Sequence, residues 1–111
     1  MKLADIQTGS YQEMPTPRGV AWTVELKADG KIIATAYHAG RGGCVDYIPT
    51  TMTRKEWQPI FEALEAEARE ATAYDFEALD LILSFAEPNQ SLTDALKTYN
   101  RYMEEYPSCQ R

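Results

Sequence analysis

The side chains in this chain that are best suited to chemistry lie together in residues 38–46. This segment contains the only histidine, three of the six glycines and one of the two cysteines. Glycines let a backbone approach a phosphate closely and direct N–H groups at it, and an arginine adds positive charge. The segment is therefore a candidate anion- or nucleotide-binding loop. Its candidate ligand-binding residues are His38, Gly40, Arg41, Gly42, Gly43 and Cys44.

The pattern of this loop is not specific to phosphate. Neither the dinucleotide fingerprint nor the P-loop sequence is present, and no helix start follows the glycines directly. A structural role accounts for the same residues, because glycines allow a tight reversal between two strands. In that interpretation Cys44 packs as a small apolar side chain and His38 ends a strand.

Two other kinds of site use the same residue types of this segment. Cys44 as a thiolate, His38 as a base and Asp46 as an orienting carboxylate would suit nucleophilic catalysis. A cysteine is more often a packed apolar residue, so no catalytic residue is predicted and the chain is not expected to be an enzyme. One histidine and two distant cysteines fall short of the ligand set of a zinc site. No metal and no cofactor are predicted.

A β-hairpin is predicted to position this segment. Residues 19–27 alternate apolar and polar side chains, as a half-buried strand does, and residues 31–38 form the returning strand. The apolar face of the first strand consists of Val20, Trp22, Val24 and Leu26. Residues 44–48 are compatible with a short third strand before Pro49.

The register of the hairpin depends on the length of its turn. A two-residue loop, Asp29-Gly30, places Trp22 opposite Tyr37 and leaves His38 on the more polar face. A three-residue loop places Trp22 opposite an alanine and moves His38 to the apolar face, because a one-residue slip exchanges the two faces. The small alanine opposite the large ring favours the three-residue loop.

A change of period after residue 50 predicts helices over residues 53–106. Thr53 and Glu56 match a capping box at a helix start. An apolar stripe follows at spacings of three and four: Trp57, Ile60, Phe61, Leu64 and Ala68. Pro59 implies either a bend or a regular helix that begins near Gln58.

Two further helices are expected. One runs from Thr72 or Ala73 to Ala86, and its many apolar positions make it the most buried of the three. The last starts at Ser91, with Asp94 as part of a capping box, and ends before Pro107. The predicted fold class is thus α+β, with an N-terminal antiparallel hairpin followed by about three helices packed on one face. All 111 residues form one domain, in which residues 1–17 are an irregular lead-in, 18–48 the β portion and 53–106 the helical portion.

The charge is divided unevenly between the two halves. Residues 1–50 hold five basic and five acidic side chains, so the net charge of −6 comes from residues 51–111. Nucleic-acid binding through that half is disfavoured, because it depends on Lys and Arg neutralising phosphates. A protein with a basic surface is the expected partner. The candidate partner-binding residues are Glu62, Glu65, Glu70, Glu77, Tyr99 and Tyr102, since tyrosine is enriched in interfaces.

The sequence also bounds the compartment. Residues 1–20 lack the apolar stretch of a signal peptide, and no segment approaches the length of a membrane span. Two cysteines far apart in the sequence do not make a disulfide framework. We expect a cytoplasmic protein without membrane contact.

Three stretches of the β portion carry a resemblance. They are Asp29-Gly30-Lys31-Ile32-Ile33-Ala34, the run from His38 to Cys44, and Tyr47. Over roughly residues 19–48 the chain resembles a loose group of uncharacterised small bacteriophage proteins that place a hairpin and a G-x-G-G turn ahead of acidic helices. The resemblance implies a phage or prophage accessory protein, a class that includes inhibitors of host defence such as anti-CRISPR proteins. No catalytic residue follows from it.

The leading hypothesis is therefore a small acidic protein-binding protein that occupies a surface of a host or partner protein, and the resemblance implies inhibition of a host defence protein as its role. Two alternatives remain. One is a small-molecule or nucleotide-binding domain that uses loop 38–44. The other is a homo-oligomer whose tyrosine-bearing last helix is the interface.

Overall fold

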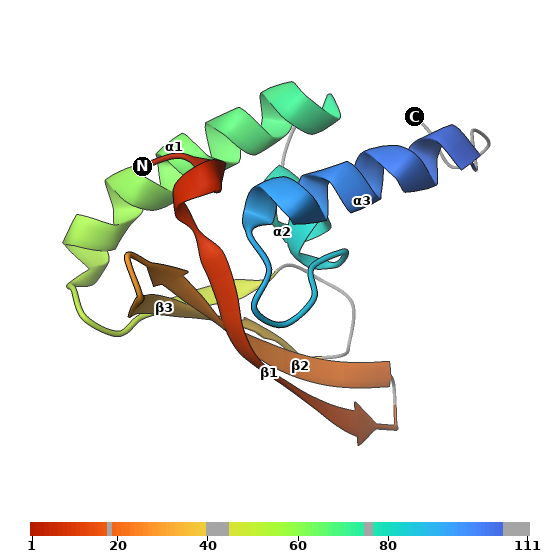
Figure 1. Ribbon diagram of the computed structural model, residues 1–111. Helices are drawn as coiled ribbons and strands as arrows, with labels where there is room; N and C mark the ends of the chain where they lie inside the picture. The colour runs from red at the N-terminus through yellow and green to blue at the C-terminus, as the bar shows by residue number, and fades with distance from the viewer. Residues whose placement is uncertain (18, 40–44, 75–76, 106–111) are drawn as a thin grey trace.

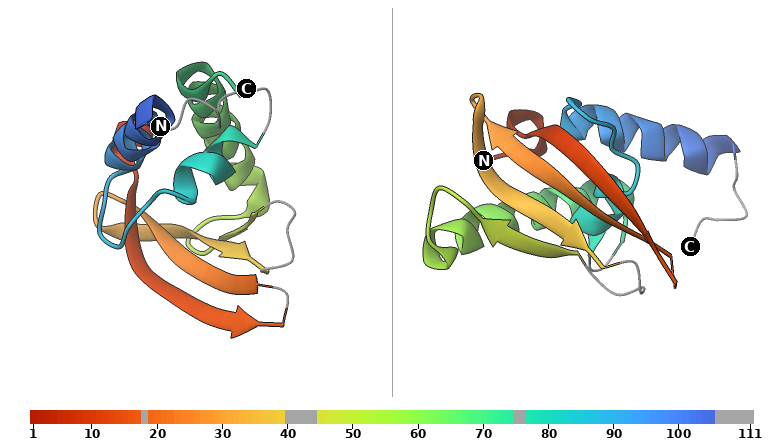
Figure 2. Two further views of the ribbon diagram at one scale, coloured as in Figure 1. Left: turned by 90° about the vertical axis from the view of Figure 1, so that its right-hand side faces the viewer. Right: turned by 90° about the horizontal axis from the view of Figure 1, so that it is seen from below.

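The computed structural model describes residues 1–17, 19–39, 45–74 and 77–105. A single 3-10 turn, η1 (Leu3–Asp5), precedes four strands and three helices. Their bounds are β1 (Gln7–Thr16), β2 (Gly19–Ala28), β3 (Lys31–His38), β4 (Asp46–Pro49), α1 (Arg54–Thr72), α2 (Ala78–Leu83) and α3 (Leu92–Glu105). The strands form an antiparallel sheet in the order β1-β2-β3-β4. The helices lie together on one side of this sheet (Figures 1 and 2), so the α+β prediction is confirmed.

The start of the chain corrects one prediction. Residues 7–16 are not an irregular lead-in but form β1, which pairs with β2 as far as Thr16. Gly9 and Ser10 together face a single residue of β2 in a β-bulge. Pro15 is tolerated because β1 is an edge strand and a proline nitrogen there can face away from its neighbour. The turn-forming residues that suggested irregular structure therefore belong to a bulge and to a sheet edge.

The turn of the central hairpin has two residues. Asp29 and Gly30 both have positive φ, 53° and 78°, which is the conformation of a type I′ turn. Residues Ala28 and Lys31 on either side of them are paired. The three-residue loop favoured from the sequence is therefore wrong.

A bulge in β3 places the His38 side chain on the face that the three-residue loop predicted for it. Ile33 is an additional residue between two ladder pairs, and it shifts the register by one position. Trp22 consequently lies opposite His38, and both side chains are on the apolar face. The face predicted for His38 is confirmed, although its partner across the strands is not the expected alanine.

The remaining elements agree with the sequence in kind more than in bounds. Residues 46–49 form β4 against β3, which confirms the short additional strand. The capping box of Thr53 and Glu56 is present, and α1 runs from Arg54 through Pro59 without a later start near Gln58. Ala73 ends α1 in the left-handed conformation, so the expected start of the next helix at that point is wrong.

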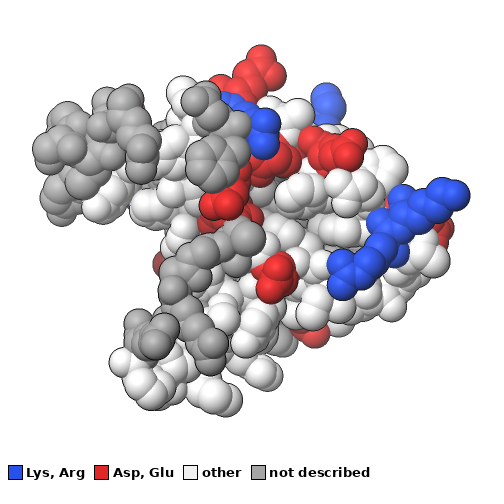
Figure 3. Space-filling view, turned by 180° about the vertical axis from the view of Figure 1, so that it is seen from behind, with Lys and Arg blue, Asp and Glu red and all other residues white. Residues whose placement is uncertain are grey.

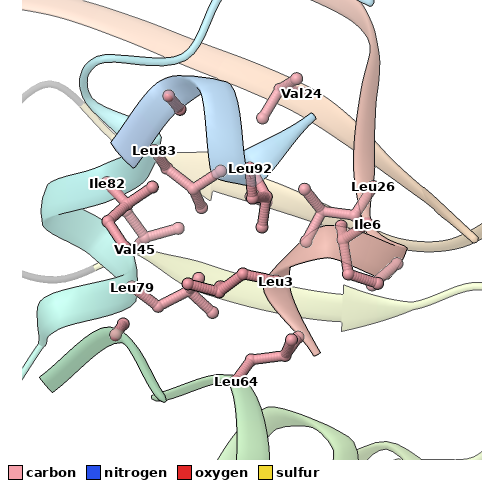
Figure 4. Packing of buried hydrophobic residues seen from close by; sticks show 14 of the residues in the cluster. Leu3, Ile6, Val24, Leu26, Val45, Leu64, Leu79, Ile82, Leu83 and Leu92 are labelled. Carbon is pink, nitrogen blue, oxygen red and sulfur yellow. The ribbon is translucent and has the colours of Figure 1, made fainter. Parts of the chain in front are cut away.

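One cluster of buried side chains joins the sheet to the helices. It includes Val24 and Leu26 of β2, Leu64 of α1, and Leu92 of α3. Helix α2 has only six residues but buries four of them, Ala78, Leu79, Ile82 and Leu83, as predicted for the most buried helix. Figure 4 shows its leucine and isoleucine side chains converging with those of η1, α1 and α3. The short helix α2 thus packs against both longer helices.

Candidate functional site

The predicted ligand loop is described only at its flanks. Residues 40–44, which include Arg41 and Cys44, lie outside the described residues. His38 ends β3 and Ala39 follows it before this segment, and Val45 and β4 come after the segment. Side chains from other elements fix these two flanks.

Asp80 of α2 fixes the second flank. One carboxylate oxygen accepts the backbone N–H of Val45 at 2.9 Å, and the other accepts the hydroxyl of Tyr47 at 2.6 Å. Burial raises the pKa of Asp80 and outweighs these two hydrogen bonds, which lower it. The nearby carboxylate of Glu65 raises this pKa further, whereas His38 lowers it. Asp80 thus brings the end of the loop, the sheet and α2 together.

The sequence analysis missed Asp80 as a site residue. The one local signal is that it is the only charged side chain in an otherwise apolar helix, Ala78–Leu83. A carboxylate in such a helix needs hydrogen-bond partners from elsewhere in the fold, because a buried charge without them is costly. The sequence does not show which segment supplies them.

Three aromatic rings form a ladder across neighbouring strands on the helix-facing side. Tyr11 of β1 stacks on Trp22 of β2 with centroids 5.9 Å apart and an interplanar angle of 19°. Trp22 stacks on His38 of β3 at 5.6 Å and 8°. The Tyr11–Trp22 pair contributes about 0.5–1.5 kcal/mol beyond area burial. Burial raises the pKa of Tyr11, and the charge of Glu13 adds to this rise. The ladder therefore holds the plane of the His38 ring at the first flank of the loop.

The arrangement does not support the catalytic grouping that was weighed for the segment. Asp46 pairs with Tyr37, the residue before His38. Successive residues of a strand point to opposite faces, so the side chains of Asp46 and His38 lie on opposite sides of the sheet. Asp46 cannot orient the His38 ring for proton transfer. Within the described ranges no group of three or more His, Cys, Asp or Glu side chains is placed to hold a metal ion.

A shallow groove lies between β4 and the first turns of α1. Its volume is about 460 Å³, and the lining residues are Val45, Asp46, Tyr47, Ile48, Arg54, Trp57, Gln58 and Phe61. The rings of Tyr47 and Phe61 meet at 5.1 Å, and Trp57 is buried beneath them. The groove offers one cation and one carboxylate, Arg54 and Asp46, so it favours neither sign of ligand charge.

The predicted partner-binding glutamates divide into two groups. Glu62, Glu70 and Glu77 are exposed. Glu65 is only 7% exposed and belongs to no surface. Its burial corrects the prediction that Glu65 binds a partner protein.

Glu65 caps α2 from α1. Its carboxylate accepts the backbone N–H of Ala78 at 3.0 Å and that of Leu79 at 2.9 Å, and it forms an ion pair with Arg69 at 2.7 Å. Burial alone would raise the pKa of Glu65, but the hydrogen bonds and the arginine charge together lower it. The residue before α2, Glu77, makes no side-chain cap of its own. Glu65 therefore supplies the cap that the local sequence does not.

The tyrosines of α3 also differ in role. Tyr99 is buried, and its hydroxyl lies 3.5 Å from the carbonyl oxygen of Thr72 at the end of α1. Burial raises the pKa of Tyr99, and Tyr74 adds to the rise. Tyr102 is 37% exposed and packs on Phe85 at 5.4 Å. Of the two predicted tyrosines, Tyr102 alone is therefore available at the surface.

Three exposed carboxylates lie in the last turns of two helices. Helices α1 and α3 run in the same direction, and their C-terminal ends point to the same side of the molecule (Figures 1 and 2). Glu70 lies in the last turn of α1, and Glu104 and Glu105 end α3. We call these three residues the acidic end. The face in Figure 3 shows acidic side chains spread over the helical half with basic ones among them, so the negative charge is not one continuous sheet.

The acidic end takes no part in the ion pairs formed among the described residues. Among the described residues, Glu70, Glu104 and Glu105 take part in neither of the ion pairs, which join Glu65 to Arg69 and Asp94 to Lys97. The last turn of α3 contains no basic residue, whereas that of α1 contains Arg69, which pairs with Glu65. The carboxylates of the acidic end consequently add to the negative ends of the α1 and α3 dipoles.

Comparisons of the chain with protein-family models, with curated proteins and with solved structures found no match in any of the three. In the part of the chain that the structure describes, no helix has the length and apolar character needed to cross a membrane. The function must therefore be inferred from the surface and the sites themselves.

Proposed function

We propose that this chain is a protein-binding protein whose acidic end docks on a basic surface of another protein. One observation carries the proposal. Glu70, Glu104 and Glu105 stand at the C-terminal ends of helices, where the macrodipole disfavours negative charge by about 0.3–1 kcal/mol per residue. Local rules that a sequence breaks at a cost to stability are expected at functional sites. Complementary charge in a partner would compensate that cost.

An exposed aromatic residue accompanies these charges. Tyr102 lies one turn before the end of α3, with its ring against Phe85. A tyrosine that is held by a neighbouring ring loses little freedom on binding and supplies apolar contact. Glu62 and Glu77 remain candidate contacts in addition to the acidic end, since both are exposed.

The resemblance to small phage proteins extends the proposal to the partner. The partner would be a host protein in the cytoplasm, and binding would block its surface. The alternative of a small-molecule site rests on residues 40–44, which lie outside the described residues. The geometry of the described residues therefore supports a small-molecule site less than it supports docking through the acidic end.

The test compares two variants with the same change of charge. The first neutralises the acidic end by Glu70→Gln, Glu104→Gln and Glu105→Gln. The matched control is Asp29→Asn, Asp46→Asn and Glu87→Gln, three exposed acids elsewhere in the molecule. Each immobilised protein is used to capture proteins from a bacterial lysate, and captured proteins are quantified by mass spectrometry.

A purified captured partner then gives affinities at several salt concentrations, from about 0.05 to 0.3 M. We expect the acidic-end variant to lose affinity about tenfold or more and to lose most of its salt dependence. The control should stay within about twofold of wild type, and equal behaviour of the two variants would refute the proposal.

Stability provides the second readout. Removing charges that oppose the helix dipoles should leave the free energy of unfolding unchanged or raise it by about 1–3 kcal/mol at low salt. A loss of binding together with a gain of stability cannot come from unfolding. A loss of both would indicate that these carboxylates serve the fold instead.

A further inference from the structure

Strand β1 forms one edge of the sheet. The segment before α3 hydrogen-bonds to the outer side of β1 only at its beginning. The backbone N–H of Thr8 donates to the carbonyl of Gln90 at 2.8 Å, and that of Leu92 donates to the carbonyl of Ile6 at 3.0 Å. An isolated bridge also joins Gln7 to Ser91. Beyond the bulge at residues 9–10, no other described segment pairs with the outer side of β1.

The outward backbone groups of the open part can be assigned by alternation. The N–H of Thr8 points away from β2, and the bulge adds one residue, so the outward positions become odd-numbered. Pro15, which has no N–H, falls on an outward position as this requires. Tyr11 and Glu13 therefore direct their N–H and C=O groups out of the sheet. Such an edge is a template for another strand.

We propose that the strand occupying this edge is β1 of a second copy of the chain. Most homodimers have two-fold symmetry. A two-fold axis at this edge places β1 of one copy antiparallel to β1 of the other. The charge distribution favours this contact, because the β half is neutral and the net charge of −6 lies in residues 51–111. The axis also reverses the direction of the helices, so the two acidic ends point away from each other.

The outward positions also set the register. Tyr11 of each copy faces Glu13 of the other, and each such pair exchanges two N–H to O=C hydrogen bonds. Gln12 lies on the axis and faces Gln12 of the second copy. A shift in one direction would place Glu13 opposite Glu13, and a shift in the other would bring the bulge into the ladder. The inference does not depend on the proposed partner protein.

A cross-linking experiment tests this register. In a chain carrying Cys44→Ser and Cys109→Ser, Gln12→Cys is compared with Met14→Cys, since both positions are exposed on the same strand face. Residues facing each other in a non-hydrogen-bonded pair have Cα atoms about 4.5 Å apart, which a disulfide can span. Two copies of residue 14 would be about 13 Å apart and could not be joined.

Under mild oxidation we expect the Gln12→Cys protein to form a covalent dimer at least about tenfold faster than the Met14→Cys protein. Equal slow rates would overturn the proposal. Faster cross-linking of the Met14→Cys protein would overturn it too, because the strands would then meet in another register.

A non-covalent test uses Glu13→Pro against Glu13→Gln. Proline at an outward position removes the donor that the second copy needs and leaves the ladder to β2 intact. In sedimentation equilibrium, wild type and Glu13→Gln should approach the mass of a dimer as concentration rises, whereas Glu13→Pro should remain monomeric with an unchanged unfolding midpoint. Wild-type protein that stays monomeric up to about 1 mM would overturn the proposal. If Glu13→Pro does not fold, the disulfide comparison decides.

Discussion

Replacement of Glu65 tests the central interaction of the helical half. We expect Glu65→Ala to lower the free energy of unfolding by about 3–5 kcal/mol, from two hydrogen bonds to a charged acceptor at about 1.5–3 kcal/mol each. The structural basis is that Ala78 and Leu79 at the start of α2 would lose their acceptor in a buried setting. Arg69 adds less than about 1 kcal/mol, because its side chain is 48% exposed.

Two further variants separate the cap from the ion pair. Glu65→Gln keeps the shape but replaces one acceptor oxygen by an amide that would face a backbone N–H, so it should cost more than half as much as Glu65→Ala. Arg69→Ala removes the cation and should cost less than about 1 kcal/mol. All proteins are unfolded with urea and followed by fluorescence, since Trp57 is only 4% exposed in the folded state.

The pH dependence gives an independent check on the charge of Glu65. Its pKa is lowered in the folded state, so the carboxylate contributes stability above the ordinary glutamate pKa, about 4.3, and this contribution is lost as the pH falls through the lower folded value. The difference in stability between wild type and Glu65→Gln should shrink over that range. A Gln variant within about 0.5 kcal/mol of wild type, or a difference that does not change with pH, would refute the assigned role.

Substitutions at three other positions give further predictions. Pro59→Ala should raise the free energy of unfolding by about 2 kcal/mol in urea titrations, because an exposed proline inside α1 leaves one carbonyl without its helical N–H. Asp80→Ala should lose about 1–3 kcal/mol by leaving the Val45 N–H without its acceptor. Asp80→Asn should stay within about 1 kcal/mol of wild type at neutral pH. Since the pKa of Asp80 is raised, its ionisation opposes folding, and wild type should gain stability over Asp80→Asn as the pH falls toward the ordinary value, about 3.9. Gly9→Ala should cost about 1 kcal/mol in thermal unfolding, because the new Cβ would lie 2.8 Å from Cε of Lys27 and 2.9 Å from a carboxylate oxygen of Glu25. No change would show that these two side chains simply move aside.

Local patterns predicted the elements whose signals are contained within a few residues. Alternation in residues 19–27, the capping box at Thr53 and the apolar stripe of α1 all appear where the sequence places them. The same holds for Ser91, whose hydroxyl accepts the N–H of Asp94 at the start of α3. These signals are reliable because turns, caps and helical periodicity depend on neighbouring residues.

Local patterns could not predict the contacts between segments that are distant in the sequence. Residues 7–16 become a strand because β2 supplies their hydrogen bonds, and proline and glycine conceal this. The two bulges that set the faces of the sheet exist only in paired strands. An isolated segment carries no sign of which neighbour it will pair with.

By itself, the amino-acid sequence determined the α+β class, the place of the central hairpin turn, the helix caps at Thr53 and Ser91, and the division into a neutral half and an acidic half. Tertiary structure alone decided which of the similar carboxylates became surface charge and which became internal hydrogen-bond acceptors. Glu65 and Glu70 look alike in sequence, yet one caps α2 and the other ends exposed on α1. The physical reason is that burial depends on how α1, α2 and the sheet pack together, and this packing brings donors to one carboxylate and water to the other.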